Sequence, residues 1–348
     1  MDSFKILVAD GSATYRKMFT KAAAELDKNA VISSASNGSE AKAMIKLIDF
    51  QLIVIDAEIA GLDALLEEIK SAHPKTYVLL ATRPSKMSNE ICTKSLAAGA
   101  ADCMIKPIQR SYSENFDVIK DKMDGIFKAL SENSAGKPPS PIEHETTRHN
   151  AGLISFRPGI VLIAASTGGP SALENVLSKI EEGFPAPILI VQHMLPHFTE
   201  TLAQNLNQKS KLRVKVADEG ESVVGGTVYI APGGVHMVLA SGNTVGTDDS
   251  PPKNGVKPSA DVLFESVAEH YSGHGVLAVI LTGMGRDGTD GLARLKDKID
   301  CFCIAQSEET CVVYGMPRVA VESGLVDKVL DLGEIADEIT RSAPANAE

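Results

Sequence analysis

The sequence lacks the features that would place the protein in a membrane or outside the cell. No apolar run approaches the roughly 20 residues that a membrane-spanning helix needs. The opening residues, Met1–Lys5, contain no basic stretch followed by an apolar core, as an export signal would. We therefore expect a cytoplasmic protein without membrane insertion.

Cysteine is scarce, with five residues among 348. No CxxC pair and no cysteine–histidine spacing typical of a metal site is present. The cysteines are scattered and lie mostly in apolar stretches, so we expect core thiols. They are Cys92, Cys103, Cys301, Cys303 and Cys311.

Positive charge is in deficit. The 34 Lys and Arg residues against 45 Asp and Glu give a formal net charge of −11. Such a surface repels a phosphate backbone over most of its area, so we expect no nucleic-acid partner.

The length of 348 residues predicts two domains. Up to about residue 130, apolar strand-like runs are each followed by helical spacing, which predicts a parallel sheet covered on both faces. These runs are Lys5–Ala9, Val31–Ala35, Leu52–Ile55, Tyr77–Ala81 and Cys103–Ile105. Residues 131–152 contain prolines among small and charged residues without periodicity, and we interpret them as a flexible linker.

A second α/β series occupies residues 153–348. We expect strands at Ile160–Ala164, Ile188–Val191, Thr227–Ile230 and Val276–Leu281, and helices near Ser171–Ile180, Thr199–Gln208 and Ala260–His270. The predicted fold class is α/β throughout: a flavodoxin-like (βα)5 domain of residues 1–130, then a doubly wound, mainly parallel sheet.

A serine lies at a sharp turn between a predicted strand and a predicted helix. The apolar strand is followed by Ser166-Thr-Gly-Gly-Pro, and helical periodicity begins at Ser171. Small residues around the serine let the backbone turn tightly, as in a nucleophile elbow, and the helix N-terminus offers free N–H groups to an oxyanion. The same turn could instead cap a helix or cradle a phosphate.

His193 and Asp287 follow two further apolar strands. The carboxyl ends of strands are where ligands bind in an open α/β sheet. Serine hydrolysis needs a nucleophile, a base and an orienting carboxylate, and Ser166, His193 and Asp287 would supply one each. Taken singly, the histidine could be structural and the aspartate a turn residue. Their order along the chain differs from that of α/β-hydrolases.

Six ordered blocks make the second domain specific. The set resembles the catalytic domain of the CheB-type chemotaxis protein-glutamate methylesterases. The blocks are IAASTGGP (163–170), VQHMLPHFT (191–199), YIAPGGVHM (229–237), KPSADVLF (257–264), LTGMGRDG (281–288) and CVVYGMPRVA (311–320). The resemblance implies Ser166 as nucleophile, His193 as general base and Asp287 as its orienting carboxylate, with Thr167 and Met284 lining the oxyanion site.

The resemblance also implies a substrate and two minor assignments. Members of the family hydrolyse glutamate methyl esters on the cytoplasmic helices of methylated chemoreceptors, and many deamidate glutamines there. No cofactor is implied for the esterase. His236 is similar to a family histidine that edges the cleft and carries no chemistry here, and we expect His197 to lie in a loop.

Four polar residues of the first domain fall where strands should end at one edge of the sheet: Asp10, Asp56, Thr82 and Lys106. Carboxylates, a hydroxyl and an ammonium at such an edge suit a transferred phosphoryl group, although each alone could be a solvated loop end. Together they resemble a two-component receiver domain. The resemblance implies Asp56 as phosphoacceptor, with Asp10, Thr82 and Lys106 around it and Tyr112 as a possible switch aromatic.

The receiver pattern has one defect. Receivers usually carry two adjacent acids after the first strand, whereas here Gly11 follows Asp10. Mg²⁺ takes oxygen ligands, so Asp10 and Asp56 without a second acid predict a weak Mg²⁺ site. Two interpretations stay open: poor phosphorylation of Asp56, or a docking module that never turns over phosphate.

The chain is thus identified as a receiver domain linked to a methylesterase, with a chemotaxis histidine kinase and chemoreceptors as implied partners. One alternative is a non-enzymatic docking regulator, which would have no need of Ser166, His193 and Asp287 together. Another is a nucleotide-binding module that uses Ser166–Pro170, but the sequence shows no acidic ribose signature for it.

Overall fold

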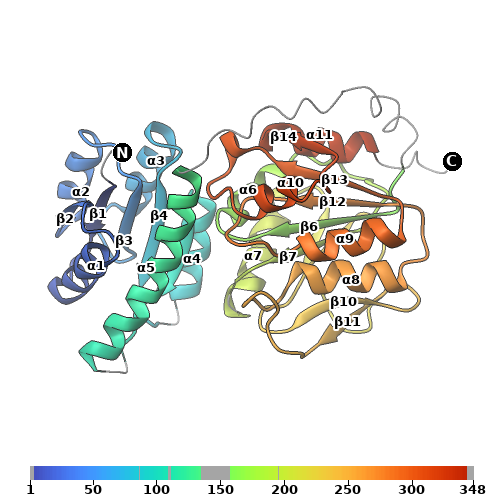
Figure 1. Cartoon of the computed structure of the whole chain (residues 1–348), viewed down its shortest axis with the longest axis horizontal. Coiled ribbons are helices and arrows are strands. Elements are labelled where there is room, and N and C mark those ends of the chain that lie inside the picture. Colours follow the sequence, from blue (N-terminus) through green and yellow to red (C-terminus); the bar gives the residue numbers. More distant parts are fainter. Residues whose placement is uncertain (1–3, 86, 109–110, 135–156, 195, 343–348) are drawn as a thin grey trace. The chain divides into compact units, whose positions relative to one another are not determined.

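We describe the protein from a computed structural model, for residues 4–85, 87–108, 111–134, 157–194 and 196–342. The chain divides into two compact units, Met1–Ser134 and Ala135–Glu348, and each is described by itself (Figure 1). Within the described residues, no helix combines the length and the apolar character needed to cross a bilayer. The predicted linker falls almost entirely outside the described residues.

The first unit is a five-stranded parallel sheet with strand order β2-β1-β3-β4-β5, which confirms the flavodoxin-like prediction. The strands are β1 (Lys5–Ala9), β2 (Val31–Ala35), β3 (Leu52–Asp56), β4 (Tyr77–Thr82) and β5 (Asp102–Ile105). The helices are α1 (Ala13–Leu26), α2 (Gly38–Ile45), α3 (Leu62–Ala72), α4 (Ser88–Ala97) and α5 (Tyr112–Ser134).

Burial explains the apolar runs of this unit. Every residue of β3 and β4 is buried, as expected for strands covered by helices on both faces, whereas the edge strand β2 is more polar and partly exposed. Helix α1 packs against α5, and α2 against α3. Helix α5 continues past the predicted domain boundary at residue 130, because residues 131–134 contain neither glycine nor proline.

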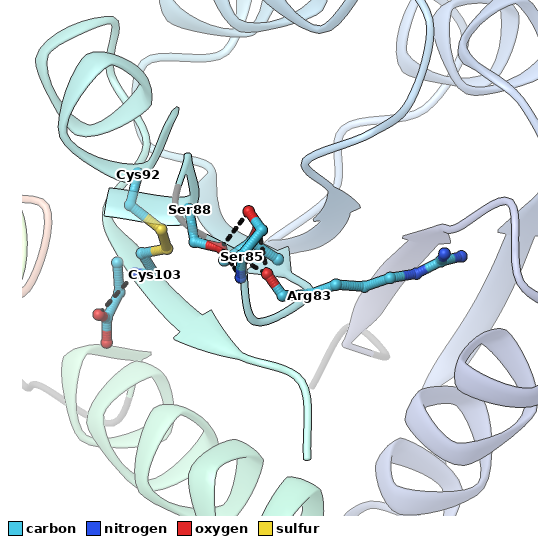
Figure 2. Close-up of a disulfide and its surroundings, with 7 residues drawn as sticks. Arg83, Ser85, Ser88, Cys92 and Cys103 are labelled. Atoms are coloured by element: carbon cyan, nitrogen blue, oxygen red, sulfur yellow. Dashed lines mark hydrogen bonds between the residues drawn. A yellow bond between two sulfur atoms is a disulfide. The ribbon is translucent and has the colours of Figure 1, made fainter. Parts of the chain in front are cut away.

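The expectation of five core thiols is wrong for two cysteines. The structure joins Cys92 of α4 to Cys103 of β5 by a disulfide, with Cα atoms 6.0 Å apart (Figure 2). The fold brings the pair together because α4 leads back to β5, and this Cα separation is usual for a disulfide. A search for short cysteine spacings misses them. Cys301, Cys303 and Cys311 are free, and burial raises the pKa of all three thiols.

The second unit is a seven-stranded parallel sheet with order β14-β13-β12-β6-β7-β9-β8, accompanied by the antiparallel hairpin β10–β11. The strands are β6 (Ile160–Ala165), β7 (Ile188–Gln192), β8 (Arg213–Val216), β9 (Thr227–Ile230), β10 (His236–Ala240), β11 (Thr244–Asp248), β12 (Val276–Ile280), β13 (Cys301–Gln306) and β14 (Lys328–Leu330). The helices are α6 (Gly169–Leu177), α7 (Pro196–Lys209), α8 (Ala260–His270), α9 (Thr289–Lys298), α10 (Met316–Glu322) and α11 (Leu332–Ser342).

The central strand β6 contributes to a core on each face of the sheet. Val161, Ile163 and Ala165 pack with α6, α7 and α11, while the alternate residues pack with α8, α9, α10 and the hairpin. Helices on both faces confirm the doubly wound prediction. A strand buried on both faces reads as a continuous apolar run, which is why the sequence predicts β6, β7, β9 and β12.

The structure contains strands that the sequence did not predict. Strands β8 and β14 are short and partly polar, and the β10–β11 hairpin is mixed in character. Strand β13, by contrast, carries an apolar run that clearly indicates a strand.

His197 was expected in a loop but belongs to α7, because Pro196 occupies the first helical position, where proline is favoured.

Candidate active site

Ser166 lies at the carboxyl end of β6, in the turn that leads into α6. Gly168 closes the turn with a φ of +77°, a left-handed conformation that glycine adopts without strain. A Cβ at this glycine would lie 2.7 Å from Val312 Cβ. Ser166 N donates to Thr282 O at 3.0 Å, and Gly169 N donates to Ser166 O at 2.8 Å. The predicted turn is therefore present, with the serine at the edge of the sheet.

His193 follows β7, the strand beside β6. Its N–H donates to Ala165 O at 3.0 Å, so the histidine and the serine leave neighbouring strands at the same level. The buried Gln192 side chain ties them again, because its Nε2 donates to the carbonyls of Ser166 at 2.9 Å and His193 at 3.1 Å. Sequence reasoning missed this glutamine, whose signal is a polar residue that ends an otherwise apolar strand.

Asp287 lies in the loop after β12 and collects the hydrogen bonds of the site. Its Oδ2 lies 2.7 Å from His193 Nε2 and accepts from Ala260 N at 2.6 Å. Its Oδ1 accepts from Ser259 Oγ at 2.6 Å and from Asp261 N at 3.2 Å. Burial opposes the ionised carboxylate, but the bonds from His193, Ser259 and Ala260 outweigh it and lower the pKa of Asp287 to about 2. The carboxylate is ionised at neutral pH.

An ionised carboxylate can only accept, so His193 donates through Nε2–H and leaves Nδ1 to accept a proton. Strand β6 lies between β7 and β12, which places Ser166 between the loops of His193 and Asp287. The chain changes direction across the sheet between β6 and β12, the kind of position where open α/β sheets bind ligands. In the described part of the chain, no hydrogen bond joins the Ser166 hydroxyl to His193; such bonds commonly tighten only with substrate bound.

The predicted oxyanion residues, Thr167 and Met284, lie on the loops that flank Ser166. Thr167 follows the serine directly and is buried, and Thr282 Oγ1 donates to its carbonyl at 2.9 Å. Gly283 precedes Met284, and a Cβ at this glycine would lie 2.7 Å from Ser166 Cβ. Only glycine allows this approach of the second loop. The oxyanion role of both residues stays a prediction.

His236 does not edge the cleft as expected. It is fully buried at the start of β10, where its Nδ1 accepts from Ser259 N at 3.0 Å and its Nε2–H donates to Pro251 O at 3.3 Å. The histidine is covered because β10 packs against α8. It accepts from Ser259, the residue before α8, whose hydroxyl donates to Asp287.

The candidate phosphorylation pocket of the first unit has an ammonium between two carboxylates. Lys106 Nζ lies 2.7 Å from Asp10 Oδ2 and 2.8 Å from Asp56 Oδ1, and all three side chains are buried. Burial raises the pKa of Asp10, although the hydrogen bond and charge of Lys106 oppose the shift. The structure thus brings together three of the four predicted residues.

Thr82 ends β4 beside this pocket but does not bond to its carboxylates. Its Oγ1 donates to Arg83 O at 3.3 Å, while Lys106 N donates to Thr82 O at 2.7 Å. The loop that follows is closed by Ser85 and Ser88, whose hydroxyls lie 2.9 Å apart (Figure 2). Thr82 is therefore connected to Lys106 of the pocket through its backbone carbonyl, and its hydroxyl makes no hydrogen bond to Asp10 or Asp56.

The aromatic residue at the pocket is Tyr15. Its hydroxyl donates to Pro107 O at 2.8 Å, and its ring lies 5.0 Å from Lys106 Nζ, a cation–π distance. Tyr112, the predicted switch aromatic, is exposed at the start of α5. Sequence position relative to Lys106 did not reveal Tyr15, because it comes from α1.

The pocket is a poor fit for Mg²⁺, which needs near-octahedral oxygen ligation. Asp10 and Asp56 are the carboxylates that could ligate the ion, and Lys106 already pairs with both. Among the described residues, no group of three or more histidine, cysteine or acidic side chains could hold a metal ion. A Cβ at Gly11 would lie 4.0 Å from Asp56 Oδ2, so an acid at this position would have reached the pocket.

Comparisons with known proteins agree with this geometry. A family model described as CheB methylesterase matches residues 161–339, and one described as response regulator receiver domain matches residues 6–113. The protein-glutamate methylesterase/protein-glutamine glutaminase of Halalkalibacterium halodurans is 39% identical over 343 residues, with 97% of each chain covered. The Bacillus subtilis protein of the same name is 36% identical over 354 residues, also covering 97% of each chain.

A solved structure is similar to the second unit. The crystal structure of the Thermotoga maritima CheB methylesterase catalytic domain is 43% identical, with a TM-score of 0.51, and the match covers 53% of this chain and 97% of that one. With full-length relatives above 30% identity and the catalytic-domain match, the chain belongs to the CheB methylesterase family and carries a receiver domain before its catalytic domain.

Proposed function

We propose that the protein hydrolyses methyl esters of glutamate residues on the cytoplasmic helices of chemoreceptors. The observation that carries the proposal is the 2.7 Å contact between His193 Nε2 and Asp287 Oδ2, on the two loops that flank Ser166. Family membership and the names of the relatives support an enzyme over a docking regulator without activity. With this substrate, the proposed site of action is the cytoplasm.

In the proposed reaction, Ser166 Oγ attacks the ester carbonyl carbon while its proton passes to His193 Nδ1. The imidazolium, stabilised by Asp287, then gives this proton to the departing methoxide, so methanol leaves and an acyl-serine forms. Water attacks the acyl-serine, its proton again passes through Nδ1, and Ser166 regains its hydroxyl. The product is a glutamate carboxylate.

The loops of Thr167 and Met284 supply the proposed oxyanion site. Both reach the serine, and the buried Thr282 side chain and Gly283 hold them there. The same residues would release ammonia from a glutamine amide. The relatives' second name, protein-glutamine glutaminase, supports this activity as well.

We also propose that Asp56 accepts a phosphoryl group from a chemotaxis histidine kinase. The buried Lys106 ammonium at 2.8 Å would balance part of the added charge. Asp10 and Asp56 are the residues that would hold Mg²⁺, weakly because Gly11 contributes no ligand. A receiver that serves only as a docking module is the alternative, and the response of the esterase to a phosphodonor distinguishes the two.

The test of the enzymatic proposal is methanol release from methylated receptor membranes. Ser166→Ala should lower the rate by at least about a thousandfold, since the nucleophile is lost, without changing thermal stability. Ser178→Ala, an exposed serine at the other end of α6, is the matched control and should keep the wild-type rate. A Ser166→Ala rate within tenfold of wild type would exclude this serine as nucleophile.

A further inference from the structure

A second carboxylate lies beside the one that contacts His193. Asp261 is fully buried in the first turn of α8, and no step of the proposed reaction uses it. Its Oδ1 accepts from Gly288 N at 2.9 Å and from Gly291 N at 2.7 Å. These two N–H groups belong to the beginning of α9, the helix that follows Asp287.

Helices α8 and α9 lie side by side (Figure 1), and a carboxylate at the beginning of each helix accepts hydrogen bonds from backbone N–H groups at the beginning of the other. Asp287 precedes α9 but accepts from Ala260 N and Asp261 N at the beginning of α8. Asp261 belongs to α8 but accepts from the beginning of α9. Each carboxylate therefore satisfies N–H groups at the positive end of the other helix. The loop of Asp287 is held on one side by its own carboxylate and on the other by Asp261.

Two neighbouring residues, Gly291 and Asn254, support this reciprocal hydrogen bonding between the two helices. A Cβ at Gly291 would lie 2.8 Å from Asp261 Cα and 2.7 Å from Phe264 Cβ, so α9 reaches α8 only because residue 291 is glycine. Asn254 Nδ2 donates to Asp261 Oδ2 at 2.6 Å and to Asp287 Oδ1 at 3.3 Å. One amide thus bridges the two acids.

The charge of Asp261 also bears on the catalytic pair. Burial raises the pKa of Asp261 to about 6, against the lowering bonds from Gly291 N and Asn254, and the charges of Asp287 and Asp290 raise it further. Asp287 precedes α9, and Asp290 lies in its first turn. Ionised Asp261 in turn adds negative charge next to Asp287, which favours the imidazolium of His193.

We propose that Asp261 is a positioning residue for the hydrolysis. By holding the beginning of α9, it fixes Asp287 against His193 and keeps the imidazole aimed at Ser166. The proposal rests on the proposed function, because the reaction is the one described above. Its test includes a measurement that needs no turnover.

Asp261→Asn in the full chain is the first variant, because it keeps the shape of the side chain and removes the charge. We expect kcat to fall at least tenfold while KM stays within twofold, since lost orientation weighs on the transition state. Asp297→Asn, which removes the charge of an exposed acid near the far end of α9, is the matched control. It should stay within twofold of wild type in both constants.

The second readout is the titration of His193, followed by NMR of the full chain labelled with ¹⁵N-histidine. His193→Gln identifies the signal. Asp261→Asn should move this signal's titration to lower pH, because the imidazolium loses both a fixed partner and a nearby negative charge. Asp297→Asn should leave the titration unchanged.

Two outcomes would contradict the proposal. Asp261→Asn could lower thermal stability yet keep the wild-type kcat and His193 titration, which would make Asp261 a purely structural link between α8 and α9. Should that variant not fold, Asn254→Gly carries the test, because glycine suits the left-handed φ of 54° and removes the shared amide. It should lower kcat severalfold at constant KM and change the His193 titration; wild-type values would refute the role. Absence of methanol release by wild type would refute the proposed function alone, since the titration is measured without turnover.

Discussion

Both units place a pair of buried carboxylates where the chain changes direction across a parallel sheet, but they compensate the charge differently. In the first unit, Asp10 and Asp56 follow or end the adjacent strands β1 and β3 and share the Lys106 ammonium. In the second, Asp261 and Asp287 lie beside β6 and β12 and are met by four backbone N–H groups and by the side chains of His193, Ser259 and Asn254.

The difference is consistent with the function proposed for each site. A single ammonium on a flexible stem would be able to shift if a phosphoryl group were added to Asp56, so we expect the compensation in the first pocket to be adjustable. Backbone N–H groups at two helix ends are fixed by the fold and hold Asp287 in one position. Fixed dipoles suit catalysis, in which no reorganisation should accompany the reaction.

The largest expected effect concerns the pair Asp261 and Asp287, which the fold holds in place. Asp287→Asn should lower kcat about 10⁴-fold, the order found when the aspartate of a serine triad is amidated, because the imidazole is no longer held in the required tautomer. Methanol release from receptor membranes measures the rate. Asp297→Asn, which changes an exposed acid on α9, the helix that follows Asp287, should have no effect. A loss below tenfold for Asp287→Asn would mean that another group orients His193.

The stability of the first unit should respond most strongly to removal of Lys106, the cation shared by Asp10 and Asp56. Lys106→Met leaves two buried carboxylates without compensation and should destabilise the first unit by about 3–5 kcal/mol. Lys94→Met, which removes an exposed pair with Asp63, should cost about 1 kcal/mol or less. Urea unfolding of both variants gives the two free energies, and similar values would show that the buried pair has no special weight.

Asp287 and Asp10 should differ in the sign of their pH dependence. The pKa of Asp287 is lowered from 3.8 to about 2, so the contribution of this carboxylate to folding stability is complete above pH 3.8 and is lost as the pH falls through about 2. The pKa of Asp10 is raised, so its contribution is complete below pH 3.8 and declines as the pH rises.

Asp287→Asn should therefore become more destabilising with rising pH, by roughly 2 kcal/mol over the acid range. Asp10→Asn should become less destabilising over the same range. Urea unfolding of both variants and wild type between pH 2 and 7 measures the slopes. Slopes of equal sign would contradict the assigned directions.

The smallest expected effect concerns the metal. Gly11→Asp supplies the missing acid and should tighten Mg²⁺ binding about tenfold, as measured by calorimetry. With acetyl phosphate and Mg²⁺, the esterase of this variant should respond more strongly than wild type, and Asp56→Ala should abolish the response. Equal affinity in Gly11→Asp and wild type would show that Gly11 is not the reason for a weak site.

The sequence predicted the features that depend on local pattern. Strands buried on both faces read as apolar runs, and Ser166, His193 and Asp287 could be placed because each follows such a run. Asp56 and Lys106 were placed at one sheet edge for the same reason, and the structure puts them 2.8 Å apart.

The rest depends on contacts between residues far apart in the sequence. Asp261, Asn254 and His236 meet around Asp287 only after α8 and the hairpin pack, so the sequence blocks that contain Asp261 and His236 do not reveal their roles. The Cys92–Cys103 pair arises in the same way. Such side chains carry no local signal.

The position of Ser166 at the end of β6 has a consequence for control of the enzyme. Backbone amides in a central strand buried on both faces exchange with solvent only through large-scale opening, which costs nearly the whole free energy of unfolding. The serine is therefore anchored to a segment that local fluctuation does not reach, and partial melting cannot serve as an off-switch. We expect control of the activity to act on access to the carboxyl end of the sheet.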